Sequence, residues 1–304
     1  MKTPRILATV AIWFGIFSAS LSAALPFTVQ TASGKHGMVV AGHPEAAAAG
    51  IRVLEAGGNA VDAAVATSLA ATVSEPYGSS LGGKHVMVYF DAKTKTATVV
   101  QGMDAISNSV DLAKFIEHRK KEQAAGKSGD IYGSGAYGYE IVGIPGLPAA
   151  LWTAHQKWGK LPWAQDVQPA IEIARGGFTV LPKTRHFFEE AERLLRRGDP
   201  EIARIYLPNG QLPVIGSRLK LEDLAHSLEV FAREGYDGFY RGPIAAMIVA
   251  AAQNHGGTLT MQDYADYQAI VQEPLTVNYR GFTLCSPDLP TTGSSYIFPT
   301  LAVL

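Results

Sequence analysis

The sequence predicts an α+β protein in which helices pack on a mostly antiparallel sheet. Two observations carry this prediction. Residues 46–75 contain two consecutive helical segments, and the second is built almost entirely of small residues. They lead into two β-branched and aromatic runs, 86–90 and 96–100, which a polar turn separates. A buried helix followed by a hairpin requires both kinds of element to share one core, as in an α+β fold.

Glycine and capping residues define the first two helices. Residues 46–56 contain no β-branched run, and Gly57 can end this helix in a left-handed conformation. Asn59 can cap the next helix, and Asp62, three residues on, can bond back toward the cap. Because small residues lie on all sides between positions 60 and 71, we expect this second helix to be buried against the sheet.

The rest of the chain alternates further helices with short strands. Helices are expected at residues 111–123, 148–158, 163–175, 184–197, 219–234, 244–254 and 259–264. Residues 124–139 read as a Gly-, Ser- and Tyr-rich loop, and a hairpin is expected around Tyr279-Arg280-Gly281, between 269–278 and 282–285. No repeat interrupts this order, so we predict that residues 25–304 form one region without an internal domain boundary.

The first 24 residues have the features of a secretory signal peptide. Lys2 and Arg5 form a basic start, residues 6–17 are apolar but short for a bilayer span, and small residues follow up to Ala24. We therefore predict a periplasmic or secreted protein without stable membrane insertion; a membrane anchor is the alternative. The net charge of −1 gives no basis for nucleic-acid binding.

Local spacings offer no metal or disulfide chemistry. Cys285 is the only cysteine and lies in an apolar run, where a buried side chain is expected. No pair of histidines or acids has the spacing of a helical zinc site, and Glu117-His118 lacks a second histidine. The remaining histidines are scattered through different elements, and we expect structural roles for them. We predict neither a metal site nor a cofactor.

One motif suggests a serine nucleophile, but its context argues against this. Residues Gly78-Ser79-Ser80-Leu81-Gly82 match the Gly-x-Ser-x-Gly elbow of serine hydrolases. That elbow needs a strand before the turn and a helix after it, whereas the predicted order here is helix, loop, strand. We interpret the segment as a glycine-rich connection, and a hydrolase that uses Ser80 is the third-ranked hypothesis.

Many motifs in order along the chain resemble the amino-terminal, large-subunit part of gamma-glutamyltransferases. They are Gly37-Met38-Val39-Val40, His43-Pro44, GGNAVDAAVA at residues 57–66, Gly82-Gly83, and residues 143–146, 158–163, 169–171 and 176–178. The resemblance continues nearly to Leu304. It implies the αββα layered fold of the amino-terminal-nucleophile hydrolases, of which we expect only the large-subunit portion here, truncated at its carboxyl end.

The resemblance also implies a mechanism. In the family, a precursor cuts itself, and the new amino-terminal threonine of a smaller subunit attacks the gamma-glutamyl amide. A free α-amine can serve as base for its own hydroxyl, which fits our failure to find a catalytic triad. No segment of this chain matches that threonine. We therefore assign no catalytic residue, and we expect a small-subunit partner and no activity from this chain alone.

At one substrate position this chain departs from the family. There, an arginine in an Arg-Glu-x-Ala-Pro stretch pairs the α-carboxylate of the glutamyl group, and here Met103 replaces the arginine and Asp104 the acid. Met103 cannot donate a hydrogen bond, so carboxylate recognition is lost at this point. Lys84, in the glycine-rich loop, is either a replacement cation or a solvated side chain.

Two functions follow from these observations. The first is the large-subunit portion of an exported gamma-glutamyltransferase-like amidase or transferase, acting on a small gamma-glutamyl-like substrate such as glutathione. The alternative is a non-catalytic exported binding protein that keeps the architecture but has lost both the arginine and the nucleophile.

Overall fold

The computed structural model describes residues 32–124 and 138–304. The chain divides into two units, Met1–Met38 and Val39–Leu304, and every helix and strand described below belongs to the second. The predicted signal peptide, and residues 125–137 of the predicted loop, lie outside the described residues. Within the parts that are described, no helix combines the length and the apolar character that crossing a membrane requires.

The first two helices form as predicted, as α2 (Pro44–Glu55) and α3 (Ala60–Ser74). Gly57 separates them with φ 91°, the left-handed conformation that glycine adopts without strain. The capping box is complete: the Asn59 side chain accepts from the amides at the start of α3, and Asp62 accepts from the Asn59 amide at 2.7 Å. These local signals were readable because each involves residues within three positions of one another.

The partner of α3 differs from the prediction. The helix packs chiefly between α2 and α6 (Trp163–Gly176), and it meets the sheet at Val61, which joins the cluster around Val100. Its small residues serve close helix packing, because a side chain added at Gly50 of α2 would meet the Thr67 hydroxyl of α3 at 2.2 Å. A buried stripe of small residues does not by itself distinguish a helix from a sheet as its neighbour.

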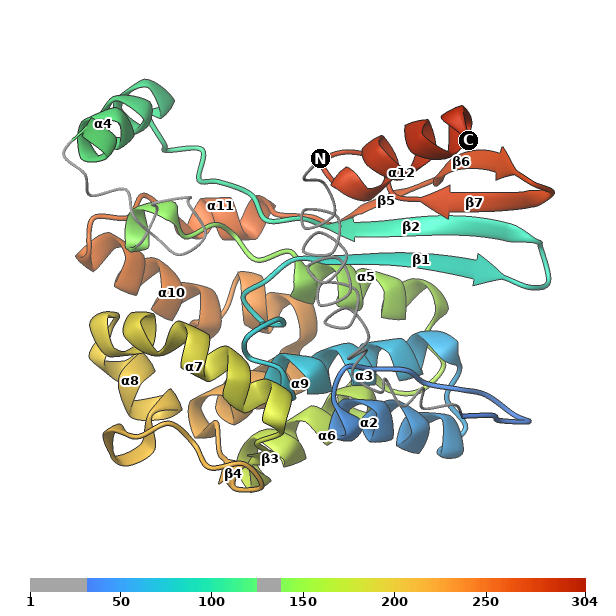
Figure 1. The fold of residues 1–304 in the computed structure, drawn as a ribbon, viewed down its shortest axis with the longest axis horizontal. Coiled ribbons are helices and arrows are strands. Elements are labelled where there is room, and N and C mark those ends of the chain that lie inside the picture. Colours follow the sequence, from blue (N-terminus) through green and yellow to red (C-terminus); the bar gives the residue numbers. More distant parts are fainter. Residues whose placement is uncertain (1–31, 125–137) are drawn as a thin grey trace, which may run out of the picture. The chain divides into compact units, whose positions relative to one another are not determined.

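The main sheet has three antiparallel strands in the order β1-β2-β5, namely β1 (His85–Asp91), β2 (Thr96–Gly102) and β5 (Ile270–Gln272). Helix α5 (Leu147–Trp158) covers one face, where Ala150 and Ala154 pack on Val100 and Trp158 stacks on Tyr89 at 4.6 Å. In Figure 1, α5 runs beside this hairpin with α2 and α3 beyond it. The predicted α+β arrangement is present, with α5 as the helix on the sheet.

Further helices build the remainder of the core. They are α4 (Leu112–Ala124), α7 (Pro182–Arg197), α8 (Pro200–Tyr206), α9 (Glu222–Tyr240), α10 (Pro243–Asn254) and α11 (Met261–Asp266), with a small β3–β4 pair at Phe178–Thr179 and Arg218–Leu219. Helix α9 runs past the predicted end at residue 234 through Gly235, whose φ is 57°. A Cβ at Gly235 would lie 2.3 Å from the Trp152 ring, so the chain bends there without a side chain.

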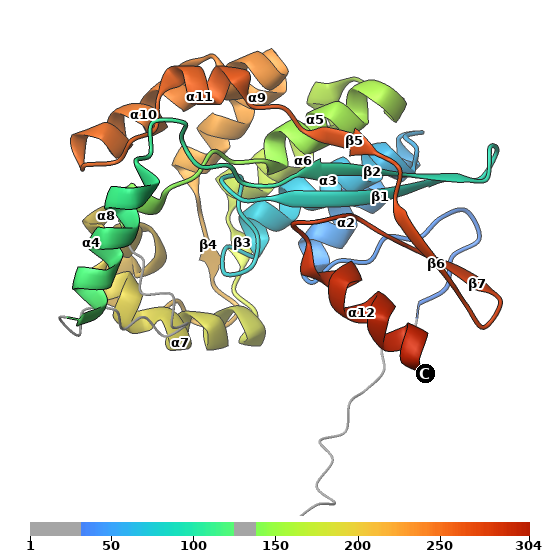
Figure 2. The same cartoon turned by 90° about the horizontal axis from the view of Figure 1, so that it is seen from above.

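The carboxyl-terminal segment contains the predicted hairpin and two corrections. Strands β6 (Leu275–Tyr279) and β7 (Phe282–Ser286) pair around the turn, and Figure 2 shows this hairpin projecting away from the main sheet. The predicted run 269–278 is divided, because β5 joins β2 instead. Cys285 is exposed and not buried as predicted, because its strand pairs with β6 in a two-stranded sheet separate from the main one. Helix α12 (Thr292–Val303) follows.

Candidate functional site

A pocket of about 380 Å³ opens where β2 ends beside the segment that leads into β5. It is lined by Gln101, Met103, Asp104, Ala105, Ile106, Asn108, Ile144, Asp263, Asp266, Tyr267, Gln268, Ile270 and Pro290. Both predicted substrate residues, Met103 and Asp104, are in this lining. The structure thus joins them with side chains from α11 and β5 that are remote in sequence and that sequence reasoning did not find.

Backbone contacts fix the wall that carries Met103. A Cβ on Gly102 would lie 2.1 Å from the carbonyl oxygen of Gly146, so β2 and the start of α5 approach as closely as only glycine permits. The Tyr267 hydroxyl donates a hydrogen bond to the Met103 carbonyl oxygen. Burial, with nearby Asp104 and then Tyr236, raises the pKa of Tyr267 to about 12. Tyr267 therefore remains a hydrogen-bond donor at neutral pH.

The charges at the pocket are mainly acidic. Met103 is half-buried and Asp104 is exposed, and Lys84 from the glycine-rich loop lies 3.4 Å from an Asp104 carboxylate oxygen. Both partners are more than half exposed, at 60% and 57%, so this ion pair is weak. None of the described lining residues is a lysine or an arginine. Lys84 is thus a solvated side chain paired with Asp104.

Asp263 holds the opposite wall and is not free to bind a ligand. It is buried, accepts from Ser107 Oγ at 2.7 Å and from the Asn108 amide at 3.0 Å, and completes a capping box with Thr260. Burial opposes ionisation, but the hydrogen bonds from Ser107, Thr260 and Asn108 lower the pKa of Asp263. The ionised carboxylate therefore links α11 to the segment after β2 through the hydrogen bonds from Ser107 and Asn108.

Ser80 lies in the connection between α3 and β1, as predicted. Its hydroxyl oxygen accepts from the Gly82 amide at 3.0 Å, a contact that closes the local turn. The order of elements is helix, loop, strand, the reverse of a nucleophile elbow. The serine-hydrolase hypothesis therefore has no structural support at this position.

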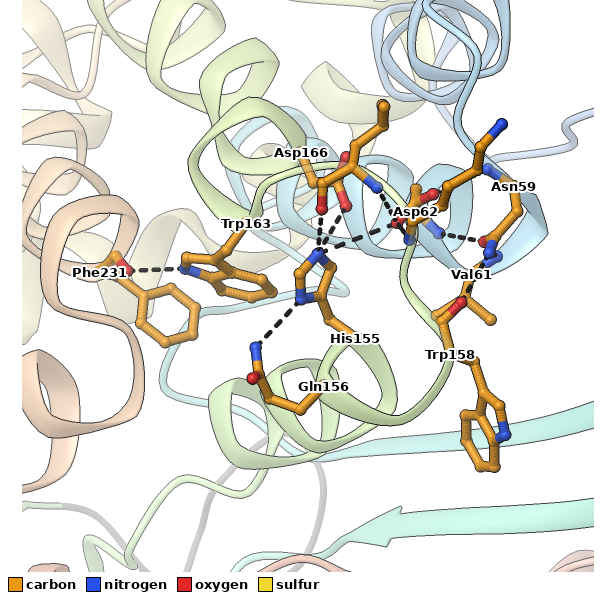
Figure 3. A network of polar contacts seen from close by, with 11 residues as sticks. Asn59, Val61, Asp62, His155, Gln156, Trp158, Trp163, Asp166 and Phe231 are labelled. Carbon is orange, nitrogen blue, oxygen red and sulfur yellow. Dashed lines mark hydrogen bonds and ion pairs between the residues drawn. The ribbon is translucent and has the colours of Figure 1, made fainter.

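A second polar cluster is buried among the helices. Asp62 of α3, His155 of α5 and Asp166 of α6 converge there, with exposed fractions of 0%, 8% and 0% (Figure 3). His155 Nε2 lies 3.5 Å from an Asp166 carboxylate oxygen and 3.9 Å from one of Asp62, and 2.9 Å from the Leu161 carbonyl oxygen. Sequence reasoning treated His155 as an isolated structural histidine because no local spacing joins the three residues.

The two carboxylates of this cluster differ in their partners. Asp62 accepts from the backbone amides of Asn59 and Lys160, whereas neither oxygen of Asp166 has a hydrogen-bond partner among the described residues. Burial, and then the proximity of Asp62, raise the pKa of Asp166 to about 8. One sequence signal could have drawn attention to it, since Asp166 interrupts the apolar face of α6 that carries Trp163 and Ala170.

Solved structures with this fold define the class of protein. The gamma-glutamyltranspeptidase of Helicobacter pylori matches with a TM-score of 0.78 and 26% identity, over 90% of this chain and 76% of that one. The chain has the α+β fold of the amino-terminal-nucleophile hydrolases, as predicted, and its region corresponds to their large subunit.

Sequence comparisons agree with this class. Residues 46–304 match the family model described as Gamma-glutamyltranspeptidase. The chain is 31% identical over 275 residues to a glutathione hydrolase proenzyme of Bacillus subtilis (strain 168), covering 90% of this chain and 45% of that protein. It is 32% identical over 286 residues to an acylase ACY 1 proenzyme of Pseudomonas sp. (strain SE83), covering 90% and 49%.

The chain belongs to the gamma-glutamyltranspeptidase family, which confirms the resemblance found in its motifs. It spans about half the length of these two curated relatives.

Proposed function

We propose that this chain is the large-subunit part of an exported amidase or transferase that acts on gamma-glutamyl-like small molecules. The observation that carries the proposal is the pocket at the end of β2, because it contains the two residues that the family resemblance assigns to substrate binding. The nucleophile is then a threonine of a small subunit produced from the same precursor. Two relatives named as proenzymes support a processed precursor.

Exposed apolar side chains support a partner subunit. Val88 and Phe90 on the outer face of β1 are 44% and 57% exposed, and Phe282 of β7 and Tyr296 of α12 are 71% and 72% exposed. Exposed large apolar side chains on neighbouring elements favour an interaction surface. We infer that the small subunit covers this side of the sheet.

The acyl group need not be glutamyl. Met103 removes the donor that would pair an α-carboxylate, and the described lining of the pocket supplies Asp104 and Asp266 but no cation. An α-carboxylate finds no cationic hydrogen-bond donor in this lining and so adds nothing to the binding free energy, whereas an acyl group without an α-carboxylate loses nothing by this absence. The relation to an acylase proenzyme is consistent with this wider range.

A second candidate is a non-catalytic exported binding protein with the same architecture. The replacement of the arginine by Met103 is the observation that favours it, because a protein freed from catalysis has no need to orient a substrate. The two candidates differ in whether the two-subunit protein turns over any acyl substrate.

The first test concerns the isolated chain. We predict that the purified 304-residue chain, folded as judged by circular dichroism, releases nothing from gamma-glutamyl anilides above a blank, because its nucleophile is on the other subunit. Turnover that persists through purification to homogeneity would contradict the assignment of the nucleophile. The related glutathione hydrolase, assayed alongside, controls for the assay.

The second test concerns Met103 in the protein assembled with its second subunit. Met103→Arg is expected to raise kcat/KM for a gamma-glutamyl anilide about ten- to hundredfold, since a charge-assisted hydrogen bond contributes about 1.5–3 kcal/mol. An analogue without the α-carboxylate should change little, because it has no group to pair.

Ile106→Arg is the matched control, because it adds the same charge to the same pocket, at an exposed position. Equal effects of Met103→Arg on both substrates, or none on either, would show that Met103 does not occupy the carboxylate position. If no variant turns over any acyl substrate while glutathione still binds in calorimetry, the binding-protein candidate replaces the enzyme.

A further inference from the structure

We propose that Asp62, His155 and Asp166 form a buried binding site for one divalent cation, with Zn²⁺ as the best match. The site joins α3, α5 and α6 and shares no residue with the pocket at the end of β2. Its role is structural, and the proposal stands independently of the proposed function.

The positions of the donor atoms suit a small cation. A tetrahedral Zn²⁺ site with ligands at about 2.0–2.2 Å places its donor atoms roughly 3.3–3.6 Å apart. His155 Nε2 lies 3.5 Å from Asp166 and 3.9 Å from Asp62, and all three donor atoms lie within 4.8 Å of one another. The Leu161 carbonyl oxygen, 2.9 Å from the same nitrogen, accepts its proton when no cation is bound, so cation binding replaces this hydrogen bond.

The charges call for a cation. Two carboxylates are buried side by side, and the only ion-pair contact recorded for either among the described residues is with His155. Asp166 is fully buried and neither of its oxygens accepts a hydrogen bond from the described residues, so ionising it beside Asp62 is costly unless a cation is bound. A divalent cation between the carboxylates would neutralise both.

Neighbouring groups already orient the ligands. Backbone amides hold Asp62: its Oδ1 accepts from Lys160 and Leu161, and its Oδ2 accepts from Asn59. Oδ2 therefore has a lone pair left to offer a metal. The His155 ring packs edge-on against Trp163, with ring centres 5.1 Å apart. The Gln156 side-chain nitrogen lies 3.3 Å from His155 Nδ1, to which it donates; rotating this amide by half a turn would place its oxygen there to accept an Nδ1 proton. Such outer contacts are typical of histidines that bind metals.

Binding has a defined proton balance. His155 binds the cation through neutral Nε2, so the ring proton sits on Nδ1, and both aspartates bind as carboxylates. Any proton that Asp166 or Nε2 carries beforehand is released to solvent on binding.

The experiment measures metal binding by the full chain without an affinity tag. After treatment with a chelator and dialysis, Zn²⁺ is titrated by calorimetry, and Co²⁺ replaces it to give the visible absorption of a tetrahedral site. We expect one equivalent per chain and a Tm that rises with Zn²⁺ concentration. Asp166→Asn should weaken binding about a hundredfold and remove the Tm response, because it removes a ligand with little change in shape.

His226→Gln is the matched control, because His226 is 72% exposed on α9 and a surface histidine should not matter. If Asp166→Asn fails to fold, His155→Gln tests the same site. Binding no tighter than that of Asp166→Asn would overturn the proposal and leave Asp166 as a buried protonated side chain. Binding lost equally in His226→Gln would also overturn it, as adventitious surface binding.

Discussion

The helices behind the main sheet and the outer face of that sheet are buried to very different extents. Among the helices, Leu69 and Phe231 have no exposed surface, and even the carboxylate of Asp62 is fully enclosed. On the outer face of the sheet Phe90 is more than half exposed, and so is Phe282 on the separate β6–β7 hairpin. The contrast shows that this chain builds a closed core from helix-to-helix packing and leaves large apolar side chains of β1 and β7 exposed.

The largest expected effect is in the closed region. Phe231→Ala should lower the free energy of unfolding by about 3–5 kcal/mol, because it leaves a cavity in a fully buried cluster. Phe282→Ala makes the same chemical change at a 71% exposed position and should cost less than about 0.5 kcal/mol. Urea denaturation of both variants checks this. Similar losses of unfolding free energy in the two variants would mean that Phe282 is as well packed as Phe231.

An intermediate effect is expected at His85, which begins the strand that carries Phe90 on its outer face. Burial lowers the pKa of His85 to about 4, and its Nε2 has no partner. The unfolded chain takes up this proton near pH 6.5, whereas the folded protein does so only near pH 4. Stability is therefore retained above pH 6.5 and lost as the pH falls from there toward 4, by at most about 1.4 kcal/mol per pH unit.

His85→Leu should flatten that part of the pH dependence in urea denaturation between pH 4 and 8. His186→Leu is the control, since His186 is 64% exposed on α7 and its replacement should leave the slope intact. An unchanged slope in His85→Leu would show that water reaches this histidine from the open side of the sheet.

The smallest change in stability, together with a clear change in self-association, is expected at the exposed residues Phe90 and Phe282. Phe90→Ser combined with Phe282→Ser should alter the free energy of unfolding by less than about 0.5 kcal/mol per site, yet reduce self-association of the isolated chain. Gel filtration and sedimentation measure this. A wild-type chain that is already monomeric and melts cooperatively would remove the need for a covering partner.

Local chemistry made much of the fold predictable. The capping boxes at Asn59 and Thr260, the glycine turn at Gly57 and both hairpins each depend on a few adjacent residues. Three predictions were wrong: that Cys285 is buried, that α3 packs mainly on the sheet, and that residues 269–278 form one strand. Each of these depends on which element distant in sequence packs against the segment.

In the candidate site, too, some residues could be identified from the sequence and others only from the structure. Family resemblance located Met103 and Asp104, whereas Tyr267 and Asp263, which hold the walls of the pocket, come from α11 and the segment after it. Asp166 was missed for a related reason: its neighbours Asp62 and His155 belong to two other helices. No local spacing rule could bring either set together.

Gly235 shows how far from the pocket a constraint on sequence variation can lie. Its left-handed bend directs Tyr236, whose hydroxyl donates to the Tyr267 carbonyl, and Tyr267 in turn donates to Met103. Since any β-carbon at Gly235 would collide with the Trp152 ring, saturation mutagenesis of this codon should return glycine alone among functional clones. We therefore expect that only glycine is tolerated at position 235, although this residue takes no part in binding or catalysis.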